Sequence, residues 1–380
     1  MKKALIRYVF FLFLFCALTL GVAAEDTALV TDELQREHAA FLDSIPPEVR
    51  DFLPESFFSQ DLAEGGEAIS EAGSIDAILR ALGKLTGIAI RENLALLAKI
   101  CGLLLLCAIF RSLASDSTKG IGKAYGFCTT LAMALLLLGL QGERFAQLER
   151  FFDTVRALCA AFLPMMGTLY AMGGNVRCAV VNHGVLSSFL TVLETLLAGT
   201  VLPIAGICLT FALLDAITSR SSLRALSGVI KRAYTLGISF LMGIFCFVLG
   251  SQSALAKASD TLALRTARFA AGSFLPLVGG SLSETLRTVA GSVTYLRSAA
   301  GTGAILVLFF AFLPTFLSLL FTRIAFLVGG AVSGMLSCEG PGKLLGELSS
   351  VFGYFLAVVA VLFVTVTFSL TLFAQCAAAG

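Results

Sequence analysis

The sequence predicts an all-α, polytopic integral membrane protein. Of its 380 residues, 57% are hydrophobic and only 14% are charged, whereas soluble domains carry about 25% charged residues. The mean hydropathy is +0.92, and apolar segments long enough to cross a bilayer recur along the chain. These observations exclude an ordinary soluble protein. They make the number of membrane crossings the first quantity to predict.

The first 24 residues have the pattern of a cleavable secretory signal peptide. Lys2, Lys3 and Arg7 supply positive charge, residues 8–20 form an apolar run that is short for a span, and small residues end at Ala24. We predict a signal peptide over residues 1–24, cleaved after Ala24. An uncleaved anchor helix is the alternative, and it would leave the next segment on the same side of the membrane.

Residues 25–90 are predicted to form an acidic extracytoplasmic helical segment. Residues 25–84 carry 14 acidic and 4 basic side chains, whereas residues 85–380 carry 11 acidic and 20 basic ones. Apolar residues at helical spacing between Ile75 and Leu85 predict an amphipathic helix. An acidic surface suits a protein partner better than anionic lipid or nucleic acid. The segment is therefore either a partner-binding arm or a solvated spacer.

Residues 91–156 are predicted to hold the first two membrane spans and an interfacial helix. The spans are expected at about 93–110 and 124–141. Residues 142–156 carry apolar side chains on one face and charged side chains on the other, as a helix lying at the membrane surface does. Farther on, residues 219–233 contain four basic side chains and no acid, which is typical of a cytoplasmic loop.

The apolar segments between these two stretches decide the number of crossings. If the chain starts outside, the first two spans return it to the outside by residue 142. An odd number of crossings must then fall between residues 142 and 219 to place the basic stretch inside. Residues 157–173 are short and contain Pro164, so we expect a re-entrant or in-plane element there. A hairpin within 185–217, broken near Pro203, is the alternative. We favour six crossings and accept six to eight.

The second part of the chain predicts an internal duplication, with units at 157–250 and 251–380. Phe-Leu-Pro at residues 162–164 recurs at 274–276, and each copy is followed by Leu-Pro, with proline spacings of 39 and 38 residues. Two crossings per unit would make the repeats parallel, and three would make them inverted. The residues expected at helix breaks or close helix contacts are Pro164, Gly167, Pro203, Pro276, Gly279, Gly280 and Pro314.

Four charged residues lie inside or near the ends of apolar segments. A charge in the bilayer core costs a few kcal/mol on insertion scales, so each is a candidate for a polar path. Glu194 lies inside its segment and is the first candidate, with a hydrogen-bonding or packing role as the alternative. Asp215, Lys99 and Arg323 lie nearer to segment ends, where a boundary position or snorkelling is the competing explanation.

Catalytic and cofactor motifs are missing from the sequence. It contains no G-x-S-x-G, H-E-x-x-H or Walker A pattern, its only histidines are His38 and His183, and it has no C-x-x-C pair. Most cysteines lie in apolar segments, where they behave as small buried hydrophobes. We therefore expect no enzyme activity, no metal, no cofactor and no nucleic-acid partner, which leaves transport or scaffold roles.

One stretch resembles a known family. The run Ala-Arg-Phe-Ala-Ala-Gly-Ser-Phe-Leu-Pro-Leu-Val-Gly-Gly-Ser-Leu-Ser-Glu-Thr-Leu at 267–286, followed by Gly291-Ser292, is similar to the stage III sporulation protein AE family. The overall plan of signal peptide, acidic external segment and polytopic body resembles it as well. The family defines no catalytic residues, so none is carried over.

The resemblance implies a multi-pass protein of the mother-cell membrane that surrounds the forespore. Its partners would be other membrane and ring-forming products of the same operon, together with a forespore-side partner across the intermembrane space. The complex would act as a channel or feeding apparatus that sustains late forespore gene expression. We thus predict a membrane subunit of a sporulation transport complex, with a non-conducting scaffold or a generic permease-like subunit as alternatives.

Overall fold

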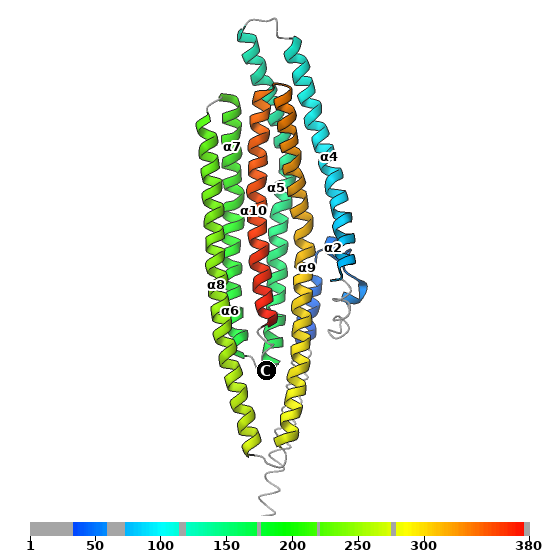
Figure 1. Cartoon of the computed structure of the whole chain (residues 1–380), viewed down its shortest axis with the longest axis vertical. Coiled ribbons are helices and arrows are strands. Elements are labelled where there is room, and N and C mark those ends of the chain that lie inside the picture. Colours follow the sequence, from blue (N-terminus) through cyan, green and yellow to red (C-terminus); the bar gives the residue numbers. More distant parts are fainter. Residues whose placement is uncertain are drawn as a thin grey trace, which may run out of the picture.

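The structure is a tall bundle of long helices that stand side by side (Figure 1). Within the described residues the chain is helical and forms no strand, which confirms the all-α class. The predicted signal peptide, with its cleavage site at Ala24, lies outside the described residues. The computed structural model describes residues 33–58, 73–113, 119–172, 176–218, 221–274 and 279–375.

Three of the helices have 54, 54 and 57 residues, and at a rise of 1.5 Å per residue each is about 80 Å long or more. That is more than twice the ~30 Å hydrocarbon core of a bilayer. Residues 33–43 are also helical, and η1 and η2 are a 3-10 and a π-helical segment. The named elements are α2 (Pro47–Arg50), η1 (Glu55–Phe58), α4 (Ile75–Leu113), α5 (Lys119–Met172), α6 (Val176–Leu196), η2 (Leu197–Val201), α7 (Leu202–Thr218), α8 (Ser221–Phe274), α9 (Gly279–Met335) and α10 (Glu339–Gln375).

The described residues contain six helical segments that are long and apolar enough to cross a membrane, in agreement with the six favoured crossings. In Figure 1 they run alternately upward and downward, so that α4, α7 and α9 end at the upper end, where α5, α8 and α10 begin. The chain is thus a multi-pass membrane protein. The segments are Ile75–Ser112, Gly126–Tyr170, Gly199–Ala216, Ala225–Ala256, Ala299–Met335 and Glu339–Leu372.

The structure shows no separate helix at 142–156, where an interfacial helix is expected, and no helix break at Pro164 within 157–173, where a re-entrant element is expected. Both stretches continue α5, which runs without interruption through Pro164. The apolar face of 142–156 does not meet lipid: Phe151 and Val155 are buried, and the Phe151 ring meets that of Phe312 on α9 edge-on, with centroids 4.7 Å apart. Tertiary packing, rather than the membrane surface, covers this face.

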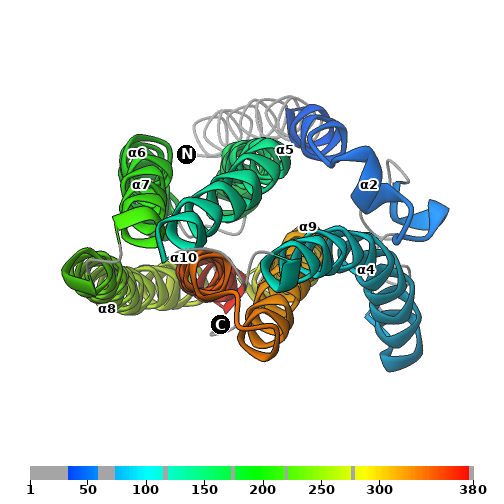
Figure 2. The same ribbon diagram turned by 90° about the horizontal axis from the view of Figure 1, so that it is seen from above.

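The alternative hairpin within 185–217 does not form either. Figures 1 and 2 show α6 and α7 as successive parts of one rod, joined through η2. The basic stretch 219–233 is not a loop, since α8 begins at Ser221 and runs to Phe274. Residues 219–220 lie outside the described residues. From Ser221 onward the stretch is therefore part of α8, and Lys231 within it is buried in the bundle.

The N-terminal segment 33–58 packs against the lower part of the bundle instead of projecting as an arm. The Phe41 ring lies 5.7 Å from that of Phe162 on α5, and the Thr168 hydroxyl donates a 2.5 Å hydrogen bond to Glu37. The Arg50 guanidinium donates to the backbone carbonyl of Leu42 at 2.9 Å, which closes the turn between the short helices. Residues from Ile75 onward belong to the first candidate span.

The centre of the bundle is formed by α9 and α10. These two helices are the most buried of the candidate spans, and α8 is the least buried. Seen along the bundle in Figure 2, α10 lies between α8, α5 and α9, while α4 packs on α9. Helices α4, α5, α7 and α8 each contact this central pair, whereas α6 packs on α5 and α8.

One close approach between helices requires glycine. A Cβ atom at Gly329 of α9 would lie 2.9 Å from Cγ2 of Ile100 on α4 and 3.5 Å from Cδ1 of Leu345 on α10. Such a separation is shorter than van der Waals contact, so α4, α9 and α10 can meet here only because the side chain is missing.

The predicted duplication stays a prediction. The hairpins α7–α8 and α9–α10 both turn at the upper end of Figure 1 and run in the same direction. Helices α4, α5 and α8 run through the positions 90, 156 and 250 at which the sequence suggested divisions, so none of these positions coincides with a break between elements.

Candidate functional site

A buried ion pair joins α8 to α10. Lys231 Nζ lies 3.3 Å from Glu347 Oε2, and the two side chains are only 6% and 5% exposed. Lys231 also donates a 2.7 Å hydrogen bond to the Ser350 hydroxyl. Both residues lie inside candidate membrane spans. A charge in this position is stable only when a partner of opposite sign accompanies it.

Two tyrosines extend this polar site toward the π-helical segment. The rings of Tyr234 and Tyr354 meet edge-on, with centroids 5.7 Å apart. The Tyr234 hydroxyl is hydrogen-bonded to that of Thr200, and the Tyr354 hydroxyl donates to the carbonyl of Val201 at 3.5 Å. Thr200 and Val201 both belong to η2. We call Lys231, Glu347, Ser350, Tyr234 and Tyr354 the α8–α10 site.

Sequence reasoning missed this site. Lys231 is one of four basic residues in a stretch interpreted as a loop, and Glu347 follows the start of an apolar span. A buried pair 116 residues apart in the chain has no signature in local spacing. The one available signal was that Tyr234 and Tyr354 each lie near the start of an apolar run.

A second polar site lies where α9 meets α4 and α5. Thr322 and Ser318, one turn apart on α9, are both buried. The Thr322 hydroxyl lies 2.8 Å from Asn93 Oδ1 on α4, and Arg144 of α5 donates a 2.5 Å hydrogen bond to Ser318. Arg144 also pairs with Glu92 of α4 at 3.4 Å. Side chains of α9 therefore hold polar groups of both flanking helices in place.

Beside these groups lies a cavity of about 650 Å³, which we call the α4–α5 cavity. Thr322 contributes from α9, and Lys99 and Arg150 approach it from α4 and α5. Among the described residues, neither of these two cations has a hydrogen bond or an ion pair. The lining residues are Glu92, Ala95, Leu96, Lys99, Glu143, Arg144, Ala146, Gln147, Arg150 and Thr322.

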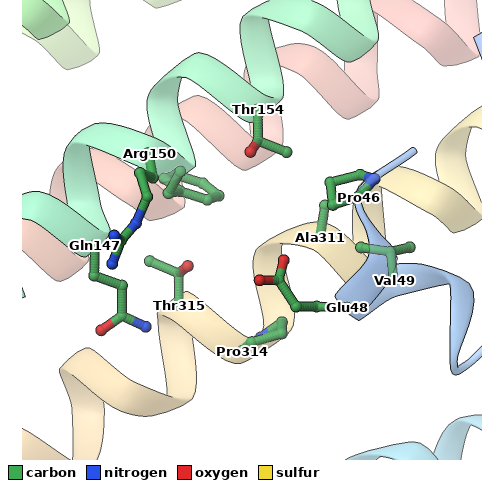
Figure 3. A pocket seen from close by; sticks show the side chains of 10 residues that line it. Pro46, Glu48, Val49, Gln147, Arg150, Thr154, Ala311, Pro314 and Thr315 are labelled. Atoms are coloured by element: carbon green, nitrogen blue, oxygen red, sulfur yellow. The ribbon is translucent and has the colours of Figure 1, made fainter. Parts of the chain in front are cut away.

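A smaller cavity of about 370 Å³ shares Gln147 and Arg150 with the first and is closed on one side by the N-terminal segment. Figure 3 shows the Glu48 carboxylate facing it from the wall opposite Arg150 and Gln147, with Pro314 and Thr315 of α9 between them. Segment 33–58, α5 and α9 thus enclose a second polar space along the same face of α5.

The charged residues nominated from the sequence lie apart from one another. Lys99 lines the α4–α5 cavity and Arg323 is exposed, with its guanidinium carbon 3.2 Å from where a Cβ on Gly353 would lie. Asp215 is buried near the upper end of α7, and its Oδ1 has no hydrogen-bond partner among the described residues. Glu194 lies in α6, but its side chain is outside the described part of the structure.

The nominated prolines and glycines also differ. Pro164 and Pro314 lie inside continuous helices, and Pro203 follows η2 as the second residue of α7. A Cβ at Gly167 would meet no atom within 4 Å, so no close helix approach occurs there. Gly279 and Gly280 begin α9, and Pro276 is outside the described residues.

Comparisons with known proteins identify one family. The sequence model described as stage III sporulation protein AE matches residues 55–379. The chain is 22% identical over 211 residues to the stage III sporulation protein AE of Bacillus subtilis (strain 168), covering 55% of this chain and 53% of that relative.

The aligned region spans about half the length of that curated relative. No solved structure is significantly similar to the chain. Because the family model extends over most of the chain, from the N-terminal segment through all six candidate spans, the chain belongs to the stage III sporulation protein AE family.

Proposed function

We propose that the chain is the membrane subunit of a sporulation transport complex linking mother cell and forespore, and that it forms part of the transport path. Membership of the family supports the sporulation role. By this proposal the protein resides in the mother-cell membrane around the forespore and assembles with other membrane and ring-forming proteins of its operon. The proposal assigns no enzymatic step to the chain.

The observation that carries a transport role, rather than a purely structural one, is the Lys231–Glu347 pair. A buried ion pair contributes less to stability than well-packed apolar residues of similar volume often would. Its cost is greater inside a membrane span, where ionisable groups mark paths for ions or substrates. The pair also sits beside η2, and π-helical segments are frequent at functional sites.

The acidic segment 33–58 supports the partner-binding part of the proposal. It packs on the lower half of the bundle and keeps acidic side chains such as Asp43 exposed. Helices of about 80 Å exceed the bilayer by roughly 50 Å. The lower half therefore offers a protein surface outside the hydrocarbon core on the side of this segment.

The test separates transport from scaffolding with one double variant. Lys231→Met combined with Glu347→Gln removes both charges and leaves no unpaired ion, so the bundle retains its packing. Spore-forming cells would express it in place of the resident protein, with Arg232→Gln, an exposed cation of the same helix, as the matched control. Membrane abundance, co-purification of operon partners and a late forespore reporter are measured together.

We expect normal abundance and normal partner recovery, with reporter activity reduced at least about 10-fold, because the variant would lack the charged pair that the transport path requires. Wild-type reporter activity would mean that the pair serves packing only, and the transport proposal at this site would fail. Loss of partner recovery along with the reporter would favour the scaffold, since assembly would then depend on the pair.

A further inference from the structure

We propose that the α4–α5 cavity binds the headgroup of an anionic phospholipid. This inference is independent of transport: it concerns another face of the bundle, formed by α4, α5 and α9. Three properties of the cavity indicate the class of ligand. They are its position at the ends of the apolar stretches of α4 and α5, the charge of its lining, and the exposed apolar side chains beyond it.

The cavity lies where the apolar stretches of α4 and α5 end. On α4, Glu92 lines the cavity and the apolar stretch 93–110 begins at the next residue. On α5, the apolar stretch 124–141 ends just before Glu143, which also lines the cavity. One helix runs upward and the other downward, so both apolar stretches extend to the same side of the cavity. Phospholipid phosphates lie at such a border.

The charge of the cavity favours an anion. Its lining holds three cations and two acids, and one acid, Glu92, is paired with Arg144. Arg144 is further fixed by Ser318 and Gln147, at 2.5 and 3.2 Å. This leaves Lys99 and Arg150 to bind a ligand. Within the lining they are opposed by Glu143, and Arg150 also faces Glu48 across the smaller cavity. Two cations beside an anchored arginine form the kind of basic pocket between helices that lipid phosphates occupy.

The apolar surface leading away from the cavity favours a lipid over a soluble phosphate. Leu105, Leu106, Ile109 and Phe110 of α4 are 53% to 56% exposed, and Phe127, Leu131 and Leu135 of α5 are 38% to 65% exposed. Acyl chains attached to a headgroup in the cavity would lie along these side chains. A soluble phosphate would use the two cations and leave this surface unused.

The test measures lipid binding to the full chain purified in detergent. Phosphatidylglycerol and phosphatidylcholine of equal chain length are titrated separately and bound lipid is counted by native mass spectrometry. The test variant is Lys99→Gln combined with Arg150→Gln. The matched control is Arg91→Gln, because Arg91 is an exposed cation on α4 next to Glu92 that does not line the cavity. Thermal unfolding verifies that each variant is folded.

We expect the first phosphatidylglycerol to bind at least about 5-fold more tightly than phosphatidylcholine, and the double variant to lose about 10-fold in affinity for it, or 1.4 kcal/mol. The Arg91→Gln protein should bind as the wild type does. Equal affinity for the two lipids, or an equal loss in the control, would overturn the proposal. Displacement by millimolar inorganic phosphate would assign the cavity to a soluble anion and likewise overturn it.

Discussion

The α8–α10 site and the α4–α5 cavity use the same kinds of charged residue in opposite ways. At the α8–α10 site, Lys231 and Glu347 are almost fully buried and face each other. At the cavity, Lys99 and Arg150 stand beside open space without a partner among the described residues. The first arrangement neutralises charge within the bundle, and the second leaves charge available to a ligand.

In a membrane bundle, the environment of a charged side chain therefore decides its role. The buried pair lies between two helices, so altering one member takes the opposite charge away from the other. The cavity cations are solvated, so altering them changes what binds but leaves the helices in place. The predictions below test the two environments against each other, beginning with the buried pair.

The largest effect is expected from Lys231→Met alone. Glu347 would keep its buried position without its cation, and breaking such a pair from one side costs about 3–5 kcal/mol. Thermal unfolding in detergent should show a large drop for this single variant and a much smaller one for Lys231→Met with Glu347→Gln. If the single and double variants unfold at the same temperature, the charges of Lys231 and Glu347 do not stabilise each other.

A smaller loss is expected from Gly329→Ala, which tests the close packing of α9 on α4 and α10. The new Cβ would lie 2.9 Å from Cγ2 of Ile100, and overpacking of this kind costs about 1–3 kcal/mol. Gly330→Ala is the matched control, because its nearest neighbour, Cβ of Leu345, would lie at 3.9 Å. Unfolding temperatures should fall only for the first variant; equal values would contradict the close approach of α4 and α9.

Thr322→Val tests the polar contact between α9 and α4 with little change in volume. The buried Asn93 carbonyl would lose its 2.8 Å hydrogen bond, at a cost of about 1–2 kcal/mol. Thr371→Val is the control, since the hydrogen bond of Thr371 goes to a carbonyl of its own helix. The free energy of unfolding should fall for Thr322→Val only. An unchanged value would mean that the Thr322–Asn93 hydrogen bond does not stabilise the contact between α9 and α4.

The smallest effect concerns pH and the N-terminal segment that closes the smaller cavity. Burial lowers the pKa of His38 from its usual value of about 6.5. Below that value the unfolded chain binds the proton more readily than the folded one, so stability falls as pH decreases through about 6.5 and levels off below the folded pKa. Limited proteolysis of segment 33–58 should accelerate on acidification in the wild type and less so in His38→Gln. Equal acceleration would exclude His38 as the cause.

The class of the fold and the number of candidate spans could be predicted from the sequence, because hydropathy and segment length are local properties. The spans near 93–110 and 124–141 lie within α4 and α5 as expected. What failed was the interpretation of amphipathic stretches. The charges of 142–156 suggested the polar face of a surface helix. Most of them are exposed, but Arg144 pairs with Glu92 of α4, and Glu143 and Arg150 line the α4–α5 cavity.

The candidate site could be predicted only in part. Lys99 was nominated and does line a cavity, whereas Lys231 and Glu347 were not nominated at all. Their pairing depends on how α8 and α10 rotate against each other, and no spacing rule within one helix contains that information. A single basic cluster can thus hold both surface cations, such as Arg232, and a buried one.

The π-helical segment η2 sets the rotational phase of the rod in which it lies. One additional residue in a turn rotates every later side chain by about 100° around the helix axis. Below η2, α6 packs on α5 and α8; above it, α7 packs on α8 and α10 and buries Ala205, Cys208 and Ala212. Insertions or deletions within Leu197–Val201 would therefore misdirect all of α7 at once, which makes these five residues far less tolerant of length changes than their plain composition suggests.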